Sequence, residues 1–123
     1  MKNIKFLDNP QDYNPNNAFV VHFSNVSSKN ELLNKYSEKL LFPDYFGFNW
    51  DALCDCLRDL SWIEQKEIVI IHDDLPKLTD EELKVYIEVL IHSVQDWKKE
   101  DEHTLEVAFP ESSEKQIKTC MQK

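Results

Sequence analysis

The sequence predicts an α/β domain with a small, three-stranded parallel sheet packed against helices. Three compact apolar runs, rich in β-branched and aromatic residues, are typical of strands and lie at residues 18–23, 67–72 and 105–109. Stretches with helical periodicity separate these runs, and no tight hairpin signal joins one run to the next. Strands that are joined through helices form right-handed crossovers, which make the strands parallel.

We expect one main domain over residues 18–110, flanked by two segments of different character. A chain of 123 residues is long enough to bury a core. Residues 1–17 form an N-terminal extension in which residues 8–17 carry loop-forming Pro, Asn and Asp, and residues 4–7 could add an edge strand. Residues 111–123 form either a short helix or a loose tail.

The first helix is expected to begin after Ser28, because Ser28 and Glu31 have the spacing of a capping box. It ends before Pro43, since the residue ahead of a proline avoids the helical conformation. Its predicted buried side chains are Leu32, Leu33, Tyr36, Leu40 and Leu41.

The second helix is expected over residues 49–60 and has two contrasting faces. Its apolar face is predicted to consist of Trp50, Leu53, Leu57 and Leu60. Asp51, Asp55 and Asp59 recur every four residues on the other side, with Arg58 beside them. Like charges at this spacing destabilise a helix by about 0.2–0.5 kcal/mol per pair. The row is therefore either an ordinary solvated face or a surface that meets a positive partner.

The central strand and the last long helix follow. Residues 67–72 are apolar on both faces, as a central parallel strand requires. Thr79 and Glu82 make a second capping box, which opens a helix that extends to about Lys99. Its predicted buried stripe is Leu83, Tyr86, Ile87, Leu90, Val94 and Trp97.

Aromatic residues crowd the loop before the second helix, around the only glycine of the chain. Tyr45, Phe46 and Phe48 follow Phe42 here, and exposed apolar rings are unfavourable unless they pack or meet a partner. Gly47 is expected to hold a positive φ or to let another backbone approach closely. Beside a row of aspartates, this arrangement favours a binding interface over a loose connector.

The overall charge limits the classes of partner. Acidic residues outnumber basic ones by 23 to 14, for a formal net charge of −9. This charge argues against nucleic acid or an anionic membrane and favours either a cationic partner or simple solubility. No apolar run approaches the roughly 18 residues of a membrane span. The first ten residues lack the apolar segment of a signal peptide, so we expect a cytoplasmic protein.

The cysteines and two of the histidines are expected to be structural or solvated. On one helix Cys54 and Cys56 point to nearly opposite sides, so they can neither pair nor chelate a metal together. With Cys120 the count is odd, which fits a reducing compartment. His92 and His103 fall on predicted polar positions. We therefore expect no metal and no other cofactor.

Residues 43–57, PDYFGFNWDALCDCL, resemble the signature of the barstar family, the bacterial inhibitors of barnase-type ribonucleases. The shared pattern is Pro, an acidic residue, an aromatic pair, Gly, Asn two residues later, and Asp-Ala-Leu followed by Asp and Leu on the same helix. The resemblance implies a barstar-like fold. It also implies an immunity protein, without catalytic activity, that binds a basic nuclease 1:1 and plugs its active site.

The resemblance implies that the partner binds the second helix and the loop before it. Asp55 would take the place of an RNA phosphate and accept hydrogen bonds from Arg and His side chains of the nuclease. Asp51 would make a second acidic contact, and Tyr45 would pack on the catalytic centre. The expected binding residues are Tyr45, Phe46, Gly47, Asn49, Asp51, Cys54, Asp55 and Asp59.

Two positions depart from the family pattern. Cys54 stands where the familiar member has a tryptophan, so one aromatic anchor is missing. A further carboxylate on the later helix falls on His92, and Glu88 or Asp96 could replace it only after a shift.

Two other functions stay open at this point. His72, Asp73 and Asp74 follow the central strand, where open α/β sheets place their active sites. With His22 they could form a metal-dependent or phosphoryl-transfer site, or they could be a polar turn. The third possibility is an acidic adaptor, which would bind a basic protein that is not a nuclease through the same aspartate surface.

Overall fold

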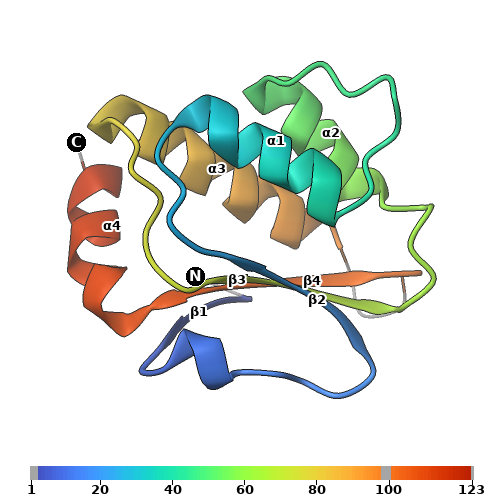
Figure 1. The fold of residues 1–123 in the computed structure, drawn as a ribbon, viewed down its shortest axis with the longest axis horizontal. Helices are drawn as coiled ribbons and strands as arrows, with labels where there is room; N and C mark the ends of the chain where they lie inside the picture. The colour runs from blue at the N-terminus through green and yellow to red at the C-terminus, as the bar shows by residue number, and fades with distance from the viewer. Residues whose placement is uncertain (1–2, 98–100, 123) are drawn as a thin grey trace.

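The computed structural model describes residues 3–97 and 101–122, which form a four-stranded parallel sheet with three helices on one face (Figure 1). The strand order is β1-β4-β3-β2, and all three pairings are parallel. The strands are β1 (Ile4–Leu7), β2 (Ala18–Phe23), β3 (Glu67–His72) and β4 (Thr104–Pro110). The parallel α/β class is confirmed. The sheet has four strands instead of the expected three, because residues 4–7 pair with β4 at one edge.

The described part of the chain also contains four α-helices and two 3-10 helices. The helices are α1 (Lys29–Lys39), α2 (Trp50–Asp59), α3 (Asp80–Asp96) and α4 (Glu114–Met121), with η1 (Pro10–Asp12) and η2 (Glu111–Ser113). Helices α1, α2 and α3 lie on one face of the sheet, and η1 with its loop lies on the other (Figure 1). Helix α4 follows β4, and its Ile117 and Cys120 are buried in the main core.

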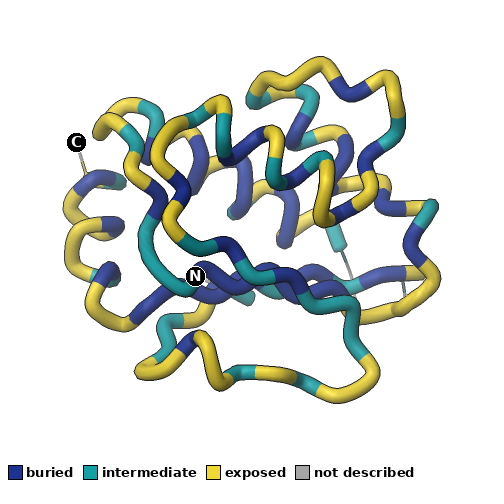
Figure 2. The backbone as a smooth tube through the Cα atoms, in the orientation of Figure 1, coloured by how far each residue is buried: buried dark blue, intermediate teal, exposed yellow. Residues whose placement is uncertain are grey.

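Strand β3 is the centre of the sheet, between β4 and β2. Its residues from Ile68 to His72 are all buried, so the prediction that both of its faces are covered is confirmed. Figure 2 shows the same contrast between buried strands and largely exposed connections. Each fully buried Ile or Val side chain contributes about 1.5–3 kcal/mol, so this strand is a major source of stability.

The start of helix α1 agrees with the prediction, but the burial predicted just after its end does not. Ser28 Oγ accepts a hydrogen bond from the Glu31 N–H at 3.1 Å, so the N-cap half of the predicted capping box is confirmed. The predicted burial of Leu41 is wrong, because this residue is 62% exposed. The chain turns left-handed at Leu41, with φ 56°, and the Phe42 N–H then donates to the Ser37 carbonyl. This closure of the helix directs the Leu41 side chain into solvent.

Helix α3 has the complete capping box that the sequence predicts. Thr79 Oγ1 accepts from the Glu82 N–H at 3.1 Å, and Glu82 Oε1 accepts from the Thr79 N–H at 2.9 Å. The helix ends at Asp96, and the predicted end near Lys99 lies outside the described residues. Six of its side chains and Ser93 are buried: Leu83, Tyr86, Ile87, Val89, Leu90, Ser93 and Val94.

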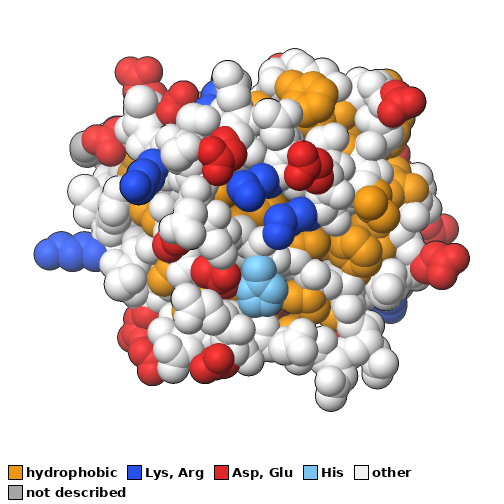
Figure 3. All heavy atoms as spheres, viewed as in Figure 1, with side chains coloured by type: hydrophobic (Ala, Val, Ile, Leu, Met, Phe, Trp, Pro, Cys, Tyr) orange, Lys and Arg blue, Asp and Glu red, His pale blue; other side chains and the backbone are white. Residues whose placement is uncertain are grey.

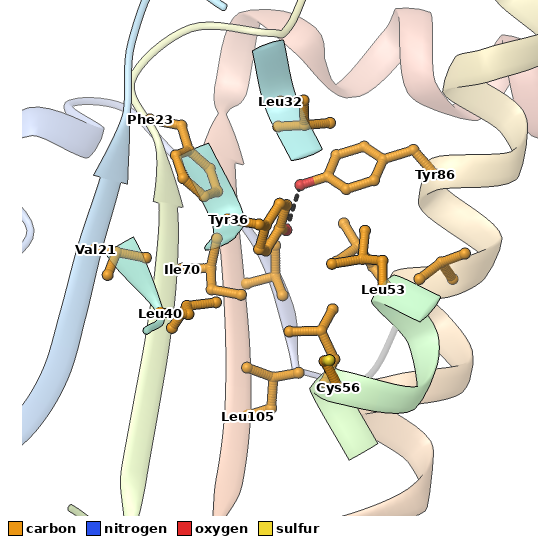
Figure 4. Packing of buried hydrophobic residues seen from close by; sticks show 14 of the residues in the cluster. Val21, Phe23, Leu32, Tyr36, Leu40, Leu53, Cys56, Ile70, Tyr86 and Leu105 are labelled. Carbon is orange, nitrogen blue, oxygen red and sulfur yellow. Dashed lines mark hydrogen bonds between the residues drawn. The ribbon is translucent and has the colours of Figure 1, made fainter. Parts of the chain in front are cut away.

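A chain of buried hydrogen bonds joins two helices to the sheet. Tyr36 of α1 meets Tyr86 of α3 at 2.5 Å (Figure 4), and Tyr86 meets His72 Nε2 at 2.7 Å. His72 Nδ1 lies 2.9 Å from the Ala108 carbonyl oxygen, which can only accept, so Nδ1 carries the proton. Nε2 therefore accepts from Tyr86, and Tyr86 in turn accepts from Tyr36. The hydrogen bonds of this buried series therefore all run in one direction, from the Tyr36 hydroxyl to the Ala108 carbonyl oxygen, and each polar group in the series has a partner.

The remaining histidine and cysteine expectations have mixed outcomes. His92 is exposed as expected, but His103 is buried, and its Nδ1 lies 2.9 Å from the Gln65 carbonyl oxygen. The expectation of a solvated His103 is wrong because this contact comes from a segment far away in the sequence. All three cysteines are free. No helix within residues 3–97 and 101–122 is long and apolar enough to span a membrane.

Acidification should destabilise the fold as the pH falls from about 6.5 to about 4. Burial lowers the pKa of His72 from 6.5 to about 4, against the opposing effects of the Ala108 carbonyl and the Asp73 charge. The unfolded chain therefore takes up the proton first. Stability that is fully present above pH 6.5 is lost on the way down to pH 4, by up to about 3 kcal/mol.

Urea unfolding of the wild type and of His72→Phe at a series of pH values across this window measures the effect. The variant should be less stable at neutral pH, because Tyr86 loses its acceptor, and its stability should change less with acidification. An equal loss in both proteins would contradict the assignment to His72.

Candidate protein-binding face

Helix α2 is fixed at its start by Asn49. Asn49 Oδ1 accepts a hydrogen bond from the Ala52 N–H at 2.8 Å, and Asn49 Nδ2 donates to the Gly47 carbonyl oxygen at 3.3 Å. The cap therefore joins the helix to the loop before it. On the inner side of the helix, Leu53, Cys56 and Leu57 are buried. This apolar side directs the opposite side of α2 outward.

The outer side of α2 carries the predicted aspartate row. Asp51, Asp55 and Asp59 are all exposed. Arg58, the basic residue beside them, forms an ion pair with Asp96 of α3. No described lysine or arginine within residues 3–97 and 101–122 forms an ion pair with the three aspartates themselves. Within the described residues, the charge of this row is thus not neutralised by an ion pair.

A shallow depression on the same side is lined by Asp55, Arg58, Asp59 and Asp96. Of the three α3 positions considered for the family's further carboxylate, Asp96 is the one that lies next to the aspartates of α2. Glu88 and His92 are also exposed on α3, but they do not line this depression. The sequence could not select Asp96, because the choice depends on how α2 and α3 cross.

The aspartates affect neighbouring ionisable groups. Desolvation, with the charges of Asp59 and Asp55, raises the pKa of the Cys56 thiol to about 11. Desolvation and then the negative charge around it also raise the pKa of Tyr45, whose hydroxyl lies 3.4 Å from Asp59 Oδ2. In both groups the contribution of Asp55 and Asp59 adds to that of desolvation, as expected from a concentration of negative charge on this side of the molecule.

The aromatic loop divides into an inner and an outer set. Phe42 and Phe46 are buried, and their ring centroids lie 4.8 Å apart. Phe46 therefore supports the loop from within, and little of its side chain is exposed. Tyr45 and Phe48 are 69% and 49% exposed. The sequence places all four rings in the loop but does not separate the two sets.

The expected backbone conformation of Gly47 is wrong. Gly47 has no positive φ, and the left-handed residue is its neighbour Phe48, with φ 52°. A Cβ on Gly47 would lie 3.3 Å from Asn49 Nδ2, so the absence of a side chain leaves room for the capping amide. The close approach that was the other expectation for Gly47 therefore involves a side chain rather than a backbone.

Cys54 lies at the seam between α2 and α3. Its side chain is partly buried, and Ser93 Oγ approaches its sulfur at 3.9 Å. Near it, Trp50 at the first turn of α2 stacks on Tyr86 with ring centroids 5.7 Å apart. Helix α2 is thus held against α3 along its length, which makes the aspartate row a rigid feature.

The residues of the alternative enzyme site have other partners. His72 is fully buried in the hydrogen-bonded chain described above. Asp73 accepts from His22 Nδ1 at 2.8 Å and from Ser24 Oγ at 2.7 Å, and Asp74 accepts from the Asn25 N–H at 3.0 Å. These contacts tie the ends of β2 and β3 together, as a polar turn does. No group of three metal-ligating side chains is present in the part of the chain that the structure describes.

Comparison with known protein families gives one match. A family model described as barstar (barnase inhibitor) matches residues 16–110, which is most of the chain. The match contains β2, β3, β4, the three helices on one sheet face and the whole aspartate surface. No curated protein and no solved structure matches the chain.

Replacement of Asn49 by Ala should lower the free energy of unfolding by about 1 kcal/mol, because the cap of α2 is lost. Asn49→Asp keeps an oxygen in the capping position and adds a negative charge at the helix N-terminus, so it should restore most of the stability. Chemical denaturation of the three proteins tests this. If Asn49→Asp is as unstable as Asn49→Ala, the hydrogen bond to Ala52 is not what stabilises the helix.

Proposed function

The chain belongs to the barstar family, and we propose that it is an immunity protein that inhibits a barnase-type ribonuclease or a related nuclease toxin. It binds the nuclease 1:1 in the cytoplasm and covers the cationic active site with α2 and the loop before it. The binding residues are the set that the signature implies: Tyr45, Phe46, Gly47, Asn49, Asp51, Cys54, Asp55 and Asp59.

One observation carries the proposal. The three aspartates of α2 are exposed on a helix whose other side is buried, and Arg58, the basic residue of the same helix, is engaged by Asp96. A nuclease site must be cationic to bind phosphate, so carboxylates fixed in space can replace the phosphates of the substrate. Because the helix is rigid, the nuclease orders few groups of the inhibitor on binding, which favours affinity.

The physical consequences of this mechanism are specific. Charge-assisted hydrogen bonds from Arg and His groups of the nuclease to Asp55 are about twice as strong as neutral ones. Opposite fields also accelerate association, an effect for which barnase and barstar are themselves the reference case. A stable complex of this kind buries about 800 Å² on each partner. The exposed side of α2, the loop and Asp96 together form a surface for such a contact.

An acidic adaptor for a basic protein that is not a nuclease would use the same surface. The family match favours the inhibitor, because the matched family is described by its action on barnase. The enzyme alternative has no such support, since its candidate residues are engaged within the fold.

Inhibition of ribonucleases tests the proposal directly. The purified protein is titrated against a panel of small cationic microbial ribonucleases, barnase included, with hydrolysis of a fluorogenic RNA as the readout. At least one enzyme should be inhibited to completion at one equivalent. If no member of the panel is inhibited and the protein instead captures a basic non-nuclease, the adaptor reading replaces the proposal.

Asp55→Ala should weaken inhibition by roughly 100-fold or more, because a buried Arg or His of the nuclease would lose its partner. Asp8→Ala removes the same charge from an exposed position in the loop after β1, on the other side of the sheet, and should leave inhibition almost unchanged. Association measured at increasing salt should slow for both. Equal effects of the two substitutions would show that only net charge matters and would contradict a defined site.

A further inference from the structure

Exposed large hydrophobic side chains gather in one loop of the molecule. Leu41, Tyr45, Phe48 and Val85 are 62%, 69%, 49% and 37% exposed, and they are the four such residues in the described chain. Three of them lie within eight consecutive residues between α1 and α2. Figure 3 shows hydrophobic side chains at the surface over this loop. Exposed apolar side chains concentrated in one short segment mark a candidate contact surface.

Two of these residues also have an unfavourable backbone conformation. Leu41 and Phe48 have φ 56° and 52°, in the left-handed region that bulky residues avoid. At three other left-handed positions the chain has asparagine, which accepts this conformation more readily: Asn3, Asn17 and Asn25.

Leu60 is the remaining left-handed residue, and its side chain is fully buried, so packing compensates for its backbone. Leu41 is mostly exposed, and Phe48 is only partly compensated, by the contact of its ring with that of Phe46. The backbone at Leu41 closes α1 through the Phe42 N–H, a role that Gly or Asn fills at lower cost. The fold of the isolated chain therefore does not explain why Leu41 and Phe48 combine an exposed side chain with a left-handed backbone.

We propose that Leu41, Tyr45 and Phe48 form an apolar rim that docks on an apolar shelf beside the cationic active site of the inhibited nuclease. This inference rests on the proposed inhibitor function and extends it. Tyr45 already belongs to the expected binding set, whereas Leu41 and Phe48 add a second element that the signature does not assign.

Tyr45 joins the rim to the aspartate row, and the ring of Phe48 is held from within. The Tyr45 hydroxyl lies 3.4 Å from Asp59 Oδ2, which joins the loop to the aspartate row. The Phe48 ring lies 4.7 Å from that of Phe46, and Phe46 in turn packs on Phe42 in the core. A ring held in this way loses little entropy on binding. It supplies an aromatic anchor near a helix that carries Cys54 in place of one.

The rim also defines the partner more narrowly than charge does. A nuclease with a cationic site but a polar border would leave Leu41 and Phe48 against polar groups that lose water without gaining a partner. Such an enzyme would be attracted by the aspartates and rejected by the rim. The aspartates thus favour cationic nucleases as a class, and the rim selects among them.

Substitution by asparagine separates binding from folding. Asn suits a left-handed backbone, so Leu41→Asn should fold with a melting temperature equal to or higher than that of the wild type. Phe48→Asn gains the same backbone relief but loses the ring contact with Phe46, so its melting temperature should stay close to that of the wild type. Each should weaken inhibition of the best-inhibited ribonuclease of the panel about 10-fold, and the double variant about 100-fold. Val85→Ala, which trims an exposed apolar side chain on α3, is the matched control and should not change inhibition.

The kinetics distinguish the rim from the acidic row. Loss of apolar contact in the rim variants should raise the dissociation rate and leave the salt dependence of association unchanged. Asp55→Ala removes a charge, so it should also reduce the salt dependence of association. If the wild type is inhibitory, Asp55→Ala is not, and the double variant inhibits as well as the wild type, the rim is refuted while the inhibitor function stands. If the wild type inhibits no ribonuclease, the function itself fails, and the rim as proposed falls with it.

Discussion

The hydrogen-bonded chain from Tyr36 through Tyr86 and His72 to the Ala108 carbonyl is the constraint on which the rest of the structure depends. It joins α1 and α3 to the carboxyl end of the central strand inside an apolar core, where an unpaired polar group would cost about 1–3 kcal/mol. Trp50 stacks on the ring of Tyr86, so the same chain also sets where α2 begins. The proposed binding surface is thus positioned by the buried hydrogen-bonded groups and by the partly buried Trp50 ring.

This rigid support explains how α2 tolerates features that would weaken an isolated helix. Its three aspartates repel one another, and a helix of ten residues is marginal alone. The Asn49 cap, the buried apolar side and the Trp97 indole, which donates to the Leu57 carbonyl at 2.8 Å, hold it against the rest of the fold. The neighbouring core stabilises α2 and the loop before it, so this region can carry three repelling aspartates and exposed rings. A partner that neutralises the charge and covers the rings recovers the energy stored there.

The sequence predicts those parts of the structure that depend on local patterns. The two sides of α2, the capping box of Thr79 and the central position of residues 67–72 all follow from residues close together in the chain. Long-range contacts account for most of the errors. The edge strand that the sequence allows at residues 4–7 is present, but so short a run does not reveal that its partner is β4. The burial of His103 depends on the distant Gln65 carbonyl. At the loop, the spacing identifies the aromatic residues, but only the three-dimensional structure shows which rings turn inward.

The two faces of the sheet separate stability from recognition. A parallel sheet must be covered on both faces. The loop with η1 packs on the face away from α2, where the Tyr13 hydroxyl donates to Glu106 at 2.6 Å and Lys5 lies 3.3 Å from the same carboxylate (Figure 1). The family match begins at residue 16, so β1 and η1 lie outside it. Since these elements cover the far face, they leave the outer side of α2 uncovered. Changes on that outer side, at the exposed aspartates, can then alter the choice of partner without disturbing the sheet.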